Sequence, residues 1–303
     1  MTIRLATRSS RLALWQAEHV AELLRAASPG LSVELVPTDT APDLDLSIPI
    51  AEFGGKGAFG KEVQELVLAG HADAAVHSAK DLQAVTPDGL TIGAVPARGT
   101  VDDCLVGARL AELGPGSVVA TGSNRRAALL RDLRPGVEVV GLRGNIETRL
   151  AVLEDGAIDA IVMATVALER LAIIPPLVER LDAETFVPQV GQGALAVECR
   201  ADDAATAELL ASINHGPSRA TLDAERSFLR VLGGDCDLPA GAHASIGTDG
   251  KVHVRGVLTG RPGEGSGELF RAEVVDLVDA DPGAALAARL VAAVEADGGS
   301  ALA

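Results

Sequence analysis

Aromatic side chains are scarce in this chain of 303 residues, which has five Phe, one Trp and no Tyr. Proteins that bind single-stranded nucleic acid stack bases on aromatic rings, so this class is not expected. The 26 basic and 42 acidic residues give a net charge of −16, which disfavours nonspecific binding to nucleic acid or to an anionic membrane. We therefore expect neither a nucleic-acid partner nor a membrane partner.

Cysteine is also rare. Cys104, Cys199 and Cys236 lie far apart, and no Cys pair or Cys/His group has the spacing of zinc ligands, so no metal is expected. Widely spaced thiols are typical of a protein from a reducing compartment. Cys104 and Cys199 adjoin apolar runs, which predicts that they are core thiols.

Long apolar runs are absent too. No stretch reaches 18 apolar residues without a charge, and arginines interrupt the N-terminal segment MTIRLATRSSRLALWQ. This pattern predicts neither a membrane span nor a signal peptide. Together with the cysteine usage, it predicts a cytoplasmic location.

The remaining composition is that of an ordinary globular protein, with 48% hydrophobic and 22% charged residues. The length predicts about two domains. Short apolar runs alternate with helical periods in two series, which the stretch PARGTVDD at 96–103 connects. Repeated strand–helix–strand units predict parallel α/β sheets.

The period of the apolar residues places the individual elements. The expected strands of the two series are 3–7, 31–37, 73–77, 90–95, 117–121, 137–142 and 159–164. The expected helices run from Ser9 or Ser10 to near Pro29, then over 59–69, 125–133 and 146–153. After residue 215, helices at 219–232 and 284–296 and strands at 242–246 and 251–258 predict a small α+β domain.

Arginine greatly outnumbers lysine, which occurs only at positions 56, 61, 80 and 251. Five arginines lie just after predicted strands or on the first turns of the following helices, namely Arg8, Arg125, Arg126, Arg143 and Arg149. Ligands of open α/β sheets bind at this edge, and guanidinium groups pair with carboxylates and phosphates. The set predicts a site for a polyanionic ligand. The simpler interpretation is a series of solvated surface ion pairs.

The segment Ser78-Ala79-Lys80-Asp81 follows a predicted strand directly. At such an edge, Lys80 can pair with an anionic group, while Asp81 can stabilise a cation or move a proton. The simpler interpretation is an aspartate that caps a helix, beside a surface lysine.

Residues 55–60 read Gly-Lys-Gly-Ala-Phe-Gly and match the GxGxxG pattern of dinucleotide-binding sites. Pro49 weakens the strand that should precede the pattern, and Asp81 lies beyond the strand end where an acidic residue is needed. A mobile loop that contacts anions, or a plain glycine-rich loop, fits the same residues.

Cys236 lies between two aspartates in the turn-rich segment GGDCDLPAG. Neighbouring carboxylates disfavour the thiolate, so this thiol is not expected to be a pre-activated nucleophile. It can still capture a strong electrophile; otherwise it is an inert loop thiol.

Eight segments in this order resemble the porphobilinogen deaminase (hydroxymethylbilane synthase) family. They are RLATRSSRLALWQA (4–17), GGKGAFGKE (54–62), ADAAVHSAKDL (72–82), TGSNRRAALL (121–130), LRGNIETRL (142–150), DAIVMATVALERL (159–171), VGQGALAVECR (190–200) and the cysteine loop (233–241). Because they span nearly the whole chain, the chain is identified as a member of this family.

The resemblance implies three domains. Two are α/β halves like type II periplasmic binding proteins, with the active-site cleft between them, and a small C-terminal α+β domain carries the cysteine. The implied boundaries are 1–98 with 188–214 for a discontinuous domain 1, 99–187 for domain 2, and 215–303 for domain 3.

The resemblance also implies an activity and a cofactor. The family condenses four porphobilinogen molecules head-to-tail into linear hydroxymethylbilane, releasing ammonia, in tetrapyrrole (haem) biosynthesis. The product grows on a dipyrromethane primer, and Cys236 occupies the position of its thioether link. Asp81 matches the catalytic aspartate, whose carboxylate stabilises the cations that form when ammonia leaves. A monomer acting on a small molecule is expected.

Further site residues follow from the same matches, because each pyrrole carries acetate and propionate groups that need cations. Besides Cys236, the implied cofactor-binding residues are Ser78, Lys80, Ser123, Arg125, Arg126, Arg143 and Arg149. The implied substrate-binding residues are Arg8, Ser10, Gln16, Phe59, Arg149 and Arg170. Lys56 and Lys61 belong to the implied active-site loop.

The chain departs from the family pattern at a few positions. Gly122 replaces a hydroxyl-bearing residue, Arg11 replaces a proline and adds a possible anion contact, and Asp235 replaces the glycine before the cysteine. The alternative function is a non-catalytic cleft-type binding protein for a polycarboxylate ligand, which needs no covalent cofactor. A dinucleotide oxidoreductase built on Gly55, Gly57 and Gly60 is a third hypothesis.

Overall fold

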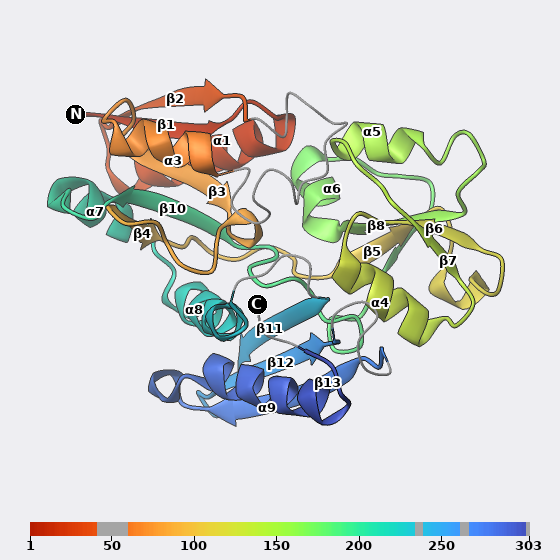
Figure 1. The fold of residues 1–303 in the computed structure, drawn as a ribbon. Helices are drawn as coiled ribbons and strands as arrows, with labels where there is room; N and C mark the ends of the chain where they lie inside the picture. The colour runs from red at the N-terminus through yellow and green to blue at the C-terminus, as the bar shows by residue number, and fades with distance from the viewer. Residues whose placement is uncertain (41–59, 234–238, 261–266, 301–303) are drawn as a thin grey trace.

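A computed structural model describes residues 1–40, 60–233, 239–260 and 267–300. The strands of these residues form two five-stranded sheets and one three-stranded sheet. The two larger sheets lie side by side, and the small sheet with its two helices lies next to both of them (Figure 1). No helix in the described part of the chain is long and apolar enough to cross a lipid bilayer.

The first sheet joins strands from both ends of the α/β region. In spatial order its strands are β2 (Ser32–Thr38), β1 (Thr2–Arg8), β3 (Ala74–Ser78), β10 (Leu195–Arg200) and β4 (Leu90–Ala94). β1 runs parallel to β2 and β3, whereas β10 runs antiparallel to β3 and β4. A strand that follows the whole second series therefore lies in the middle of the first sheet.

The second sheet repeats this order. Its strands are β7 (Glu138–Val140), β6 (Val118–Ala120), β8 (Ala160–Ala164), β5 (Asp103–Val106) and β9 (Val178–Arg180). β5, which follows the first series, runs antiparallel to β8 and β9. Each sheet thus receives one strand from the chain as it crosses over from the other sheet.

The strands of the predicted parallel sheets do run parallel, and β5 and β10 are the two antiparallel exceptions. The register gives the reason: Leu195 at the start of β10 pairs with Ser78 at the end of β3, and Asp103 at the start of β5 pairs with Ala164 at the end of β8. The chain crosses at the carboxyl ends of the parallel strands, so a strand that starts there must run the other way. The same crossings place both connecting segments at the edge where ligands bind.

Helices cover both larger sheets. The first has α1 (Arg11–Ala27), α3 (Lys61–Leu68) and α7 (Ala204–Ala211), and the second has α4 (Asn124–Leu133), α5 (Ile146–Ala151) and α6 (Thr165–Leu171). The apolar periods predict α1, α3, α4 and α5 but not the short helices α6 and α7. In α1, Ala17, Val20 and Leu24 are fully buried, and the Ser10 side chain caps the helix by accepting from the backbone N–H of Ala13. Short 3-10 turns occur at Ala79–Asp81, Leu110–Glu112 and Val278–Ala280.

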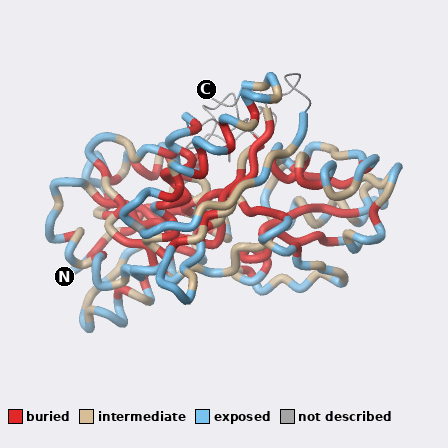
Figure 2. The backbone as a smooth tube through the Cα atoms, turned by 90° about the horizontal axis from the view of Figure 1, so that it is seen from below, coloured by how far each residue is buried: buried red, intermediate tan, exposed pale blue. Residues whose placement is uncertain are grey.

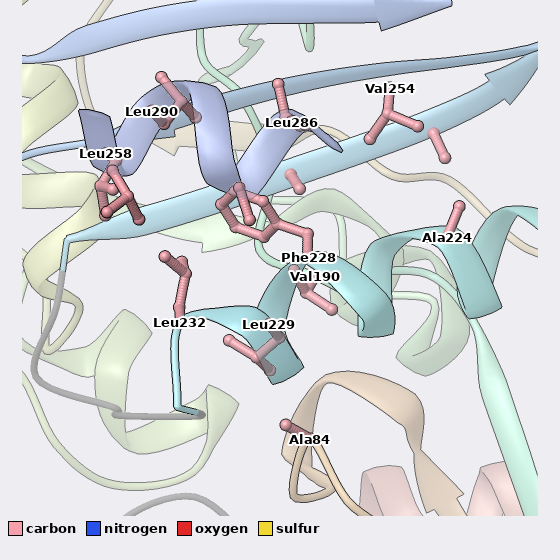
Figure 3. Packing of buried hydrophobic residues seen from close by; sticks show 14 of the residues in the cluster. Ala84, Val190, Ala224, Phe228, Leu229, Leu232, Val254, Leu258, Leu286 and Leu290 are labelled. Carbon is pink, nitrogen blue, oxygen red and sulfur yellow. The ribbon is translucent and has the colours of Figure 1, made fainter. Parts of the chain in front are cut away.

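The C-terminal part is the predicted α+β unit. Its meander of β11 (Ala240–Ile246), β12 (Val252–Leu258) and β13 (Phe270–Asp276) is covered by α8 (Gly216–Val231) and α9 (Pro282–Ala296). Figure 3 shows Phe228 of α8 and Leu286 and Leu290 of α9 packed over the sheet. Buried residues gather on the inner strands and the inner helix faces (Figure 2), whereas the edge strands β2, β7, β9 and β13 carry none.

Differences from the predicted elements have local causes. The helix expected to start at 219 starts at Gly216, because the His215 side chain caps it by accepting from the backbone N–H of Ser218. Strand β5 is buried along its whole length, so it shows no alternation and was not predicted. The core positions of Cys104 on β5 and Cys199 on β10 are confirmed, since both are fully buried.

Candidate active site

The chain crosses between the larger sheets twice, in the outgoing segment between β4 and β5 and in the returning segment between β9 and β10. These two crossing segments touch at the edge shared by the larger sheets. An ideal Cβ on Gly193 would lie 2.6 Å from the carbonyl oxygens of Gly99 and Thr100, and one on Gly191 would lie 2.9 Å from the backbone nitrogen of Lys80. Both glycines also have positive φ, +74° at Gly191 and +85° at Gly193. The turn around residue 192 therefore packs tightly against both the outgoing segment and the end of β3.

Lys80 and Asp81 lie in the 3-10 turn that follows β3. Ser78 occupies the N-cap position of this turn and Asp81 its last position, so Asp81 does not cap a helix. The Lys80 Nζ lies 3.4 Å from the side-chain oxygen of Gln192, and both Lys80 and Asp81 are partly buried. Burial, helped by the positive charge of Arg126 and opposed by the negative charge of Asp81, lowers the pKa of Lys80 to about 8.

A small cavity of about 20 Å³ lies beside Lys80, which is room for one water. It brings together four of the predicted residues, since Gln16, Ser78, Lys80 and Arg170 all line it. Gln16 is buried and its amide donates to the Ser78 hydroxyl at 2.8 Å.

Arg170 reaches this region from α6, across the edge shared by the sheets. Its guanidinium donates to the carbonyl of Gly193 at 2.8 Å and lies 5.5 Å from the centre of the Trp15 ring. Burial lowers the pKa of Arg170 to about 10. The arginine therefore stays charged at neutral pH.

Helix α4 supplies two further predicted arginines from its first turn. The Ser123 hydroxyl caps the helix by accepting from the backbone N–H of Arg126. Arg125 and Arg126 are both buried, and both donate to Asp103, the first residue of β5, with one nitrogen of each at 2.7 Å. A buried carboxylate thus balances one of the two buried positive charges.

Asp103 is fully buried and keeps its negative charge. Burial by itself raises the pKa of a carboxyl, but the charges and hydrogen bonds of Arg126 and Arg125 hold the pKa of Asp103 far below its usual range. Arg125 also donates to the carbonyl of Val187 at 2.7 Å and lies 5.9 Å from the centre of the Phe186 ring. Its buried Nε has no hydrogen-bond partner among the described residues.

Arg149 of α5 completes the cationic group. Burial, together with the charges of Arg126 and Arg143 and opposed by the charge of Asp81, lowers its pKa to about 10. We call Lys80, Arg126, Arg143 and Arg149 the cationic cluster. Its members come from both larger sheets and repel one another, so a bound polyanion would be strongly stabilised.

The remaining predicted residues lie in several places. Arg8 is the last residue of β1 and is partly buried, Ser10 caps α1, and Lys61 is the exposed first residue of α3. Lys56, Phe59 and Cys236 lie outside the described residues, as does most of the GxGxxG segment.

Two departures from the family pattern have structural consequences. A Cβ at Gly122 would lie 2.6 Å from the carbonyl oxygen of Leu142, so a serine there would displace that backbone. Arg11 donates to Glu147 of α5 at 3.0 Å, which makes an ion pair between the two halves.

Sequence reasoning missed Asp103 and Gln192. Asp103 is the last residue of the connecting stretch PARGTVDD, and Gln192 lies in the segment VGQGALAVECR. A signal was present in each case: an acidic residue beside an apolar run, and a glutamine between two glycines. Neither pattern indicates its partners, which are distant in the chain.

The geometry favours one kind of chemistry. A cationic cluster suits a ligand with several carboxylates, and the nearby Asp81 carboxylate suits a step in which positive charge develops. Across residues 1–40, 60–233, 239–260 and 267–300, no group of three or more His, Cys, Asp or Glu side chains could hold a metal ion.

Comparison with solved structures finds distant likenesses. One is the periplasmic VFT2 domain of BvgS from Bordetella pertussis, which is 18% identical with a TM-score of 0.43, over 75% of this chain and 92% of that domain. Another is an ancestral cationic amino acid solute-binding protein, 14% identical with a TM-score of 0.44, over 69% of this chain and 86% of that protein.

Sequence comparison finds close relatives. The porphobilinogen deaminase of Nitratidesulfovibrio vulgaris strain Miyazaki F is 46% identical over 257 residues, which are 84% of this chain and 81% of the relative. The porphobilinogen deaminase of Xanthomonas oryzae pv. oryzae strain PXO99A is 48% identical over 80% of this chain and 81% of the relative.

Family models match both parts of the chain. Residues 3–208 match the model described as "Porphobilinogen deaminase, dipyromethane cofactor binding domain". Residues 220–290 match the model described as "Porphobilinogen deaminase, C-terminal domain". The two matches cover both α/β sheets with their cationic cluster and most of the C-terminal unit, and on these matches the chain belongs to the porphobilinogen deaminase family.

Proposed function

We propose that the chain is a hydroxymethylbilane synthase. It condenses four porphobilinogen molecules head-to-tail into linear hydroxymethylbilane, with release of ammonia, in tetrapyrrole biosynthesis. Family membership supports the reaction, and the cationic cluster beside Asp81 is the structural observation that supports it best. The binding-protein alternative is not favoured, because it leaves Asp81 without a task.

The residues fit a dipyrromethane cofactor. Its carboxylates match a donor set of cations, and the buried Nε of Arg125, which has no hydrogen-bond partner in the described part of the chain, fits a site for a polyanion. We propose that it is held by Ser78, Lys80, Ser123, Arg125, Arg126, Arg143 and Arg149, with Cys236 as the point of covalent attachment. When bound, the cofactor supplies the pyrrole end to which new units are added.

The side chains of this chain have distinct tasks in the proposal. Arg8, Ser10, Gln16, Phe59, Arg149 and Arg170 bind the incoming porphobilinogen. Lys56 is assigned to an active-site loop, together with Lys61 at the start of α3. The partly buried Asp81 carboxylate stabilises the positive charge that develops on a pyrrole as ammonia leaves, and it accepts a pyrrole proton.

The proposed organisation follows the two crossings. Domain 1 comprises residues 1–98 and 188–214, domain 2 residues 99–187, and domain 3 residues 215–303. We further propose a monomer that works in the cytoplasm on a small molecule, without a nucleic-acid or membrane partner. Sedimentation equilibrium of the purified protein tests the monomer.

The first experiment is the intact denatured mass of the purified protein, followed by peptide mapping. An added mass of two pyrrole units on the Cys236 peptide supports the proposal. If the chain is unmodified and still gains no mass when incubated with porphobilinogen, the proposal is wrong.

The second experiment tests the role of Asp81. The Asp81→Asn variant should retain the cofactor mass but turn over porphobilinogen at least 100-fold more slowly, because an amide carries no charge to stabilise a cation. Asp88→Asn is a matched control on an exposed loop residue. Turnover of Asp81→Asn near the parent rate would remove Asp81 from the mechanism.

A further inference from the structure

Between the two larger sheets lies a buried chain of hydrogen bonds that the proposed function leaves unexplained. The side chain of Gln192 is fully buried, and its oxygen faces the Lys80 Nζ at 3.4 Å. Its nitrogen donates to the carbonyl of Val101 at 2.6 Å and to Asp103 at 3.0 Å. One amide therefore joins the end of β3 to the start of β5.

Asp103 extends this series of hydrogen bonds to helix α4. One carboxylate oxygen accepts from Arg125 at 2.7 Å, and the other accepts from Arg126 at 2.7 and 3.2 Å as well as from Gln192. Both oxygens are thus engaged, and the directions of two guanidinium groups are set by one side chain. Arg126 is further held by the carbonyl of Val162 at 3.2 Å.

The backbone leaves Gln192 little freedom to move. Gly191 and Gly193 flank it in the left-handed region, with no room for a Cβ on either side. The turn closes with a hydrogen bond from the Gln192 N–H to the carbonyl of Gln189 at 3.0 Å. The side chain is therefore directed from a rigid turn.

We propose that Gln192 and Asp103 are positioning residues that pre-assemble the cationic wall for the cofactor carboxylates. Gln192 fixes the position of Lys80 of one half relative to Asp103. Asp103 in turn fixes Arg125 and Arg126 of the other half. Neither residue needs to touch the cofactor. Electrostatic sites bind tightly when their donors are fixed in advance, because no reorganisation is then needed on binding.

This inference rests on the proposed function, and its test separates the two. Apo-protein is incubated with porphobilinogen, and the gain of two pyrrole units is followed by intact mass. If the parent chain gains no mass, the proposed function fails. If the parent gains this mass, the inference is judged by comparing the loading rate of each variant with that of the parent.

The central variant is Gln192→Met, which keeps the size of the side chain and removes its hydrogen bonds. Gln64→Met is the matched control, because Gln64 is also a buried glutamine that donates to a buried carboxylate, Glu198, at 2.7 Å. Both variants leave a carboxylate one donor short, so both should lose stability. Only Gln192→Met should load at least 10-fold more slowly.

A charge-removing pair tests the other half of the proposal. Asp103→Asn should stay largely apo, because the two buried arginines lose their shared counter-charge and one of the two oxygens becomes an NH2 group that cannot accept a hydrogen bond. Asp102→Asn makes the same chemical change one residue away, at an ion pair with the exposed Arg180, and should load like the parent. If Asp103→Asn does not fold, Gln192→Met decides the test. If Gln192→Met does not fold either, Gln192→Asn takes its place.

The pH dependence of loading distinguishes positioning from a merely structural role. Lys80 faces Asp81 on its own segment, Asp103 of β5, Arg126 of α4 and Arg149 of α5, and Arg170 of α6 lines the same cavity. In Gln192→Met, Lys80 loses an acceptor for its charged form, so loading should fail at a lower pH than in the parent. Equal loading rates for Gln192→Met and the parent, or equal slowing of Gln192→Met and Gln64→Met with unchanged pH profiles, would overturn the inference.

Discussion

Arg98 and Glu225 form a doubly hydrogen-bonded ion pair, with nitrogen–oxygen distances of 2.7 and 3.0 Å. Arg98 lies on the outgoing crossing segment and Glu225 on α8, so the pair joins the α/β region to the C-terminal unit. Glu225 is fully buried and also accepts from the backbone N–H groups of Gly191 and Ala244. One carboxylate on α8 therefore binds three other parts of the fold.

Glu225→Gln should lower the free energy of unfolding by about 3 kcal/mol, because it leaves a buried guanidinium without its counter-charge. Chemical denaturation measures this. Asp223→Asn on the same helix removes only an exposed pair with Arg219 and should change stability by less than about 0.5 kcal/mol. Similar losses in both variants would show that the Arg98 pair adds no special stability.

The same carboxylate predicts a pH dependence of stability. Burial raises its pKa, but Arg98 and His243 outweigh burial and lower it to about 2 from an ordinary value of 4.5. The unfolded chain therefore binds the proton more readily, so this stabilisation is complete above about pH 4.5 and is lost as the pH falls towards 2. Unfolding midpoints between pH 5 and 2 should fall less steeply in Glu225→Gln than in the parent. Parallel curves would contradict the shift.

Gly193→Ala should destabilise the fold strongly. The new Cβ would lie 2.6 Å from two carbonyl oxygens, in addition to the cost of a positive φ. Gly30→Ala is the control, since φ there is +89° and nothing lies within 4 Å, so only the conformational cost of about 1–2 kcal/mol applies. Urea unfolding of both variants should show at least twice the loss for Gly193→Ala; equal losses would mean that the crossing segments separate easily.

Lys80 predicts how cofactor loading depends on pH. With its pKa lowered to about 8, mainly by burial, the ammonium loses its proton above pH 8 and no longer attracts carboxylates. Loading of apo-protein, followed by intact mass, should slow as the pH rises from 7 to 9. Lys80→Arg keeps its charge over this range and should flatten the profile. An unchanged profile in Lys80→Arg would assign the pH dependence to another group, such as the amine of porphobilinogen.

Much of this protein could be predicted from local patterns. The apolar period placed α1, α4 and most strands, because whether a residue faces the core of its own helix or strand depends on its near neighbours in the chain. The same patterns placed Lys80 and Asp81 after a strand, and Arg125 and Arg126 on a first helical turn. The family resemblance then supplied the roles that a pattern of residue types leaves open.

Only the tertiary structure decided how these pieces meet. Gln192 and Asp103 are 89 positions apart, and their contact exists because the chain crosses twice at the carboxyl ends of the parallel strands. The crossings also set the direction of β5 and β10, which no local period encodes. The sequence by itself determined which elements form and which charged residues lie at their ends. The packing of the two halves against each other, through the contact at Gly191 and Gly193, determined which of those charged residues are buried and paired.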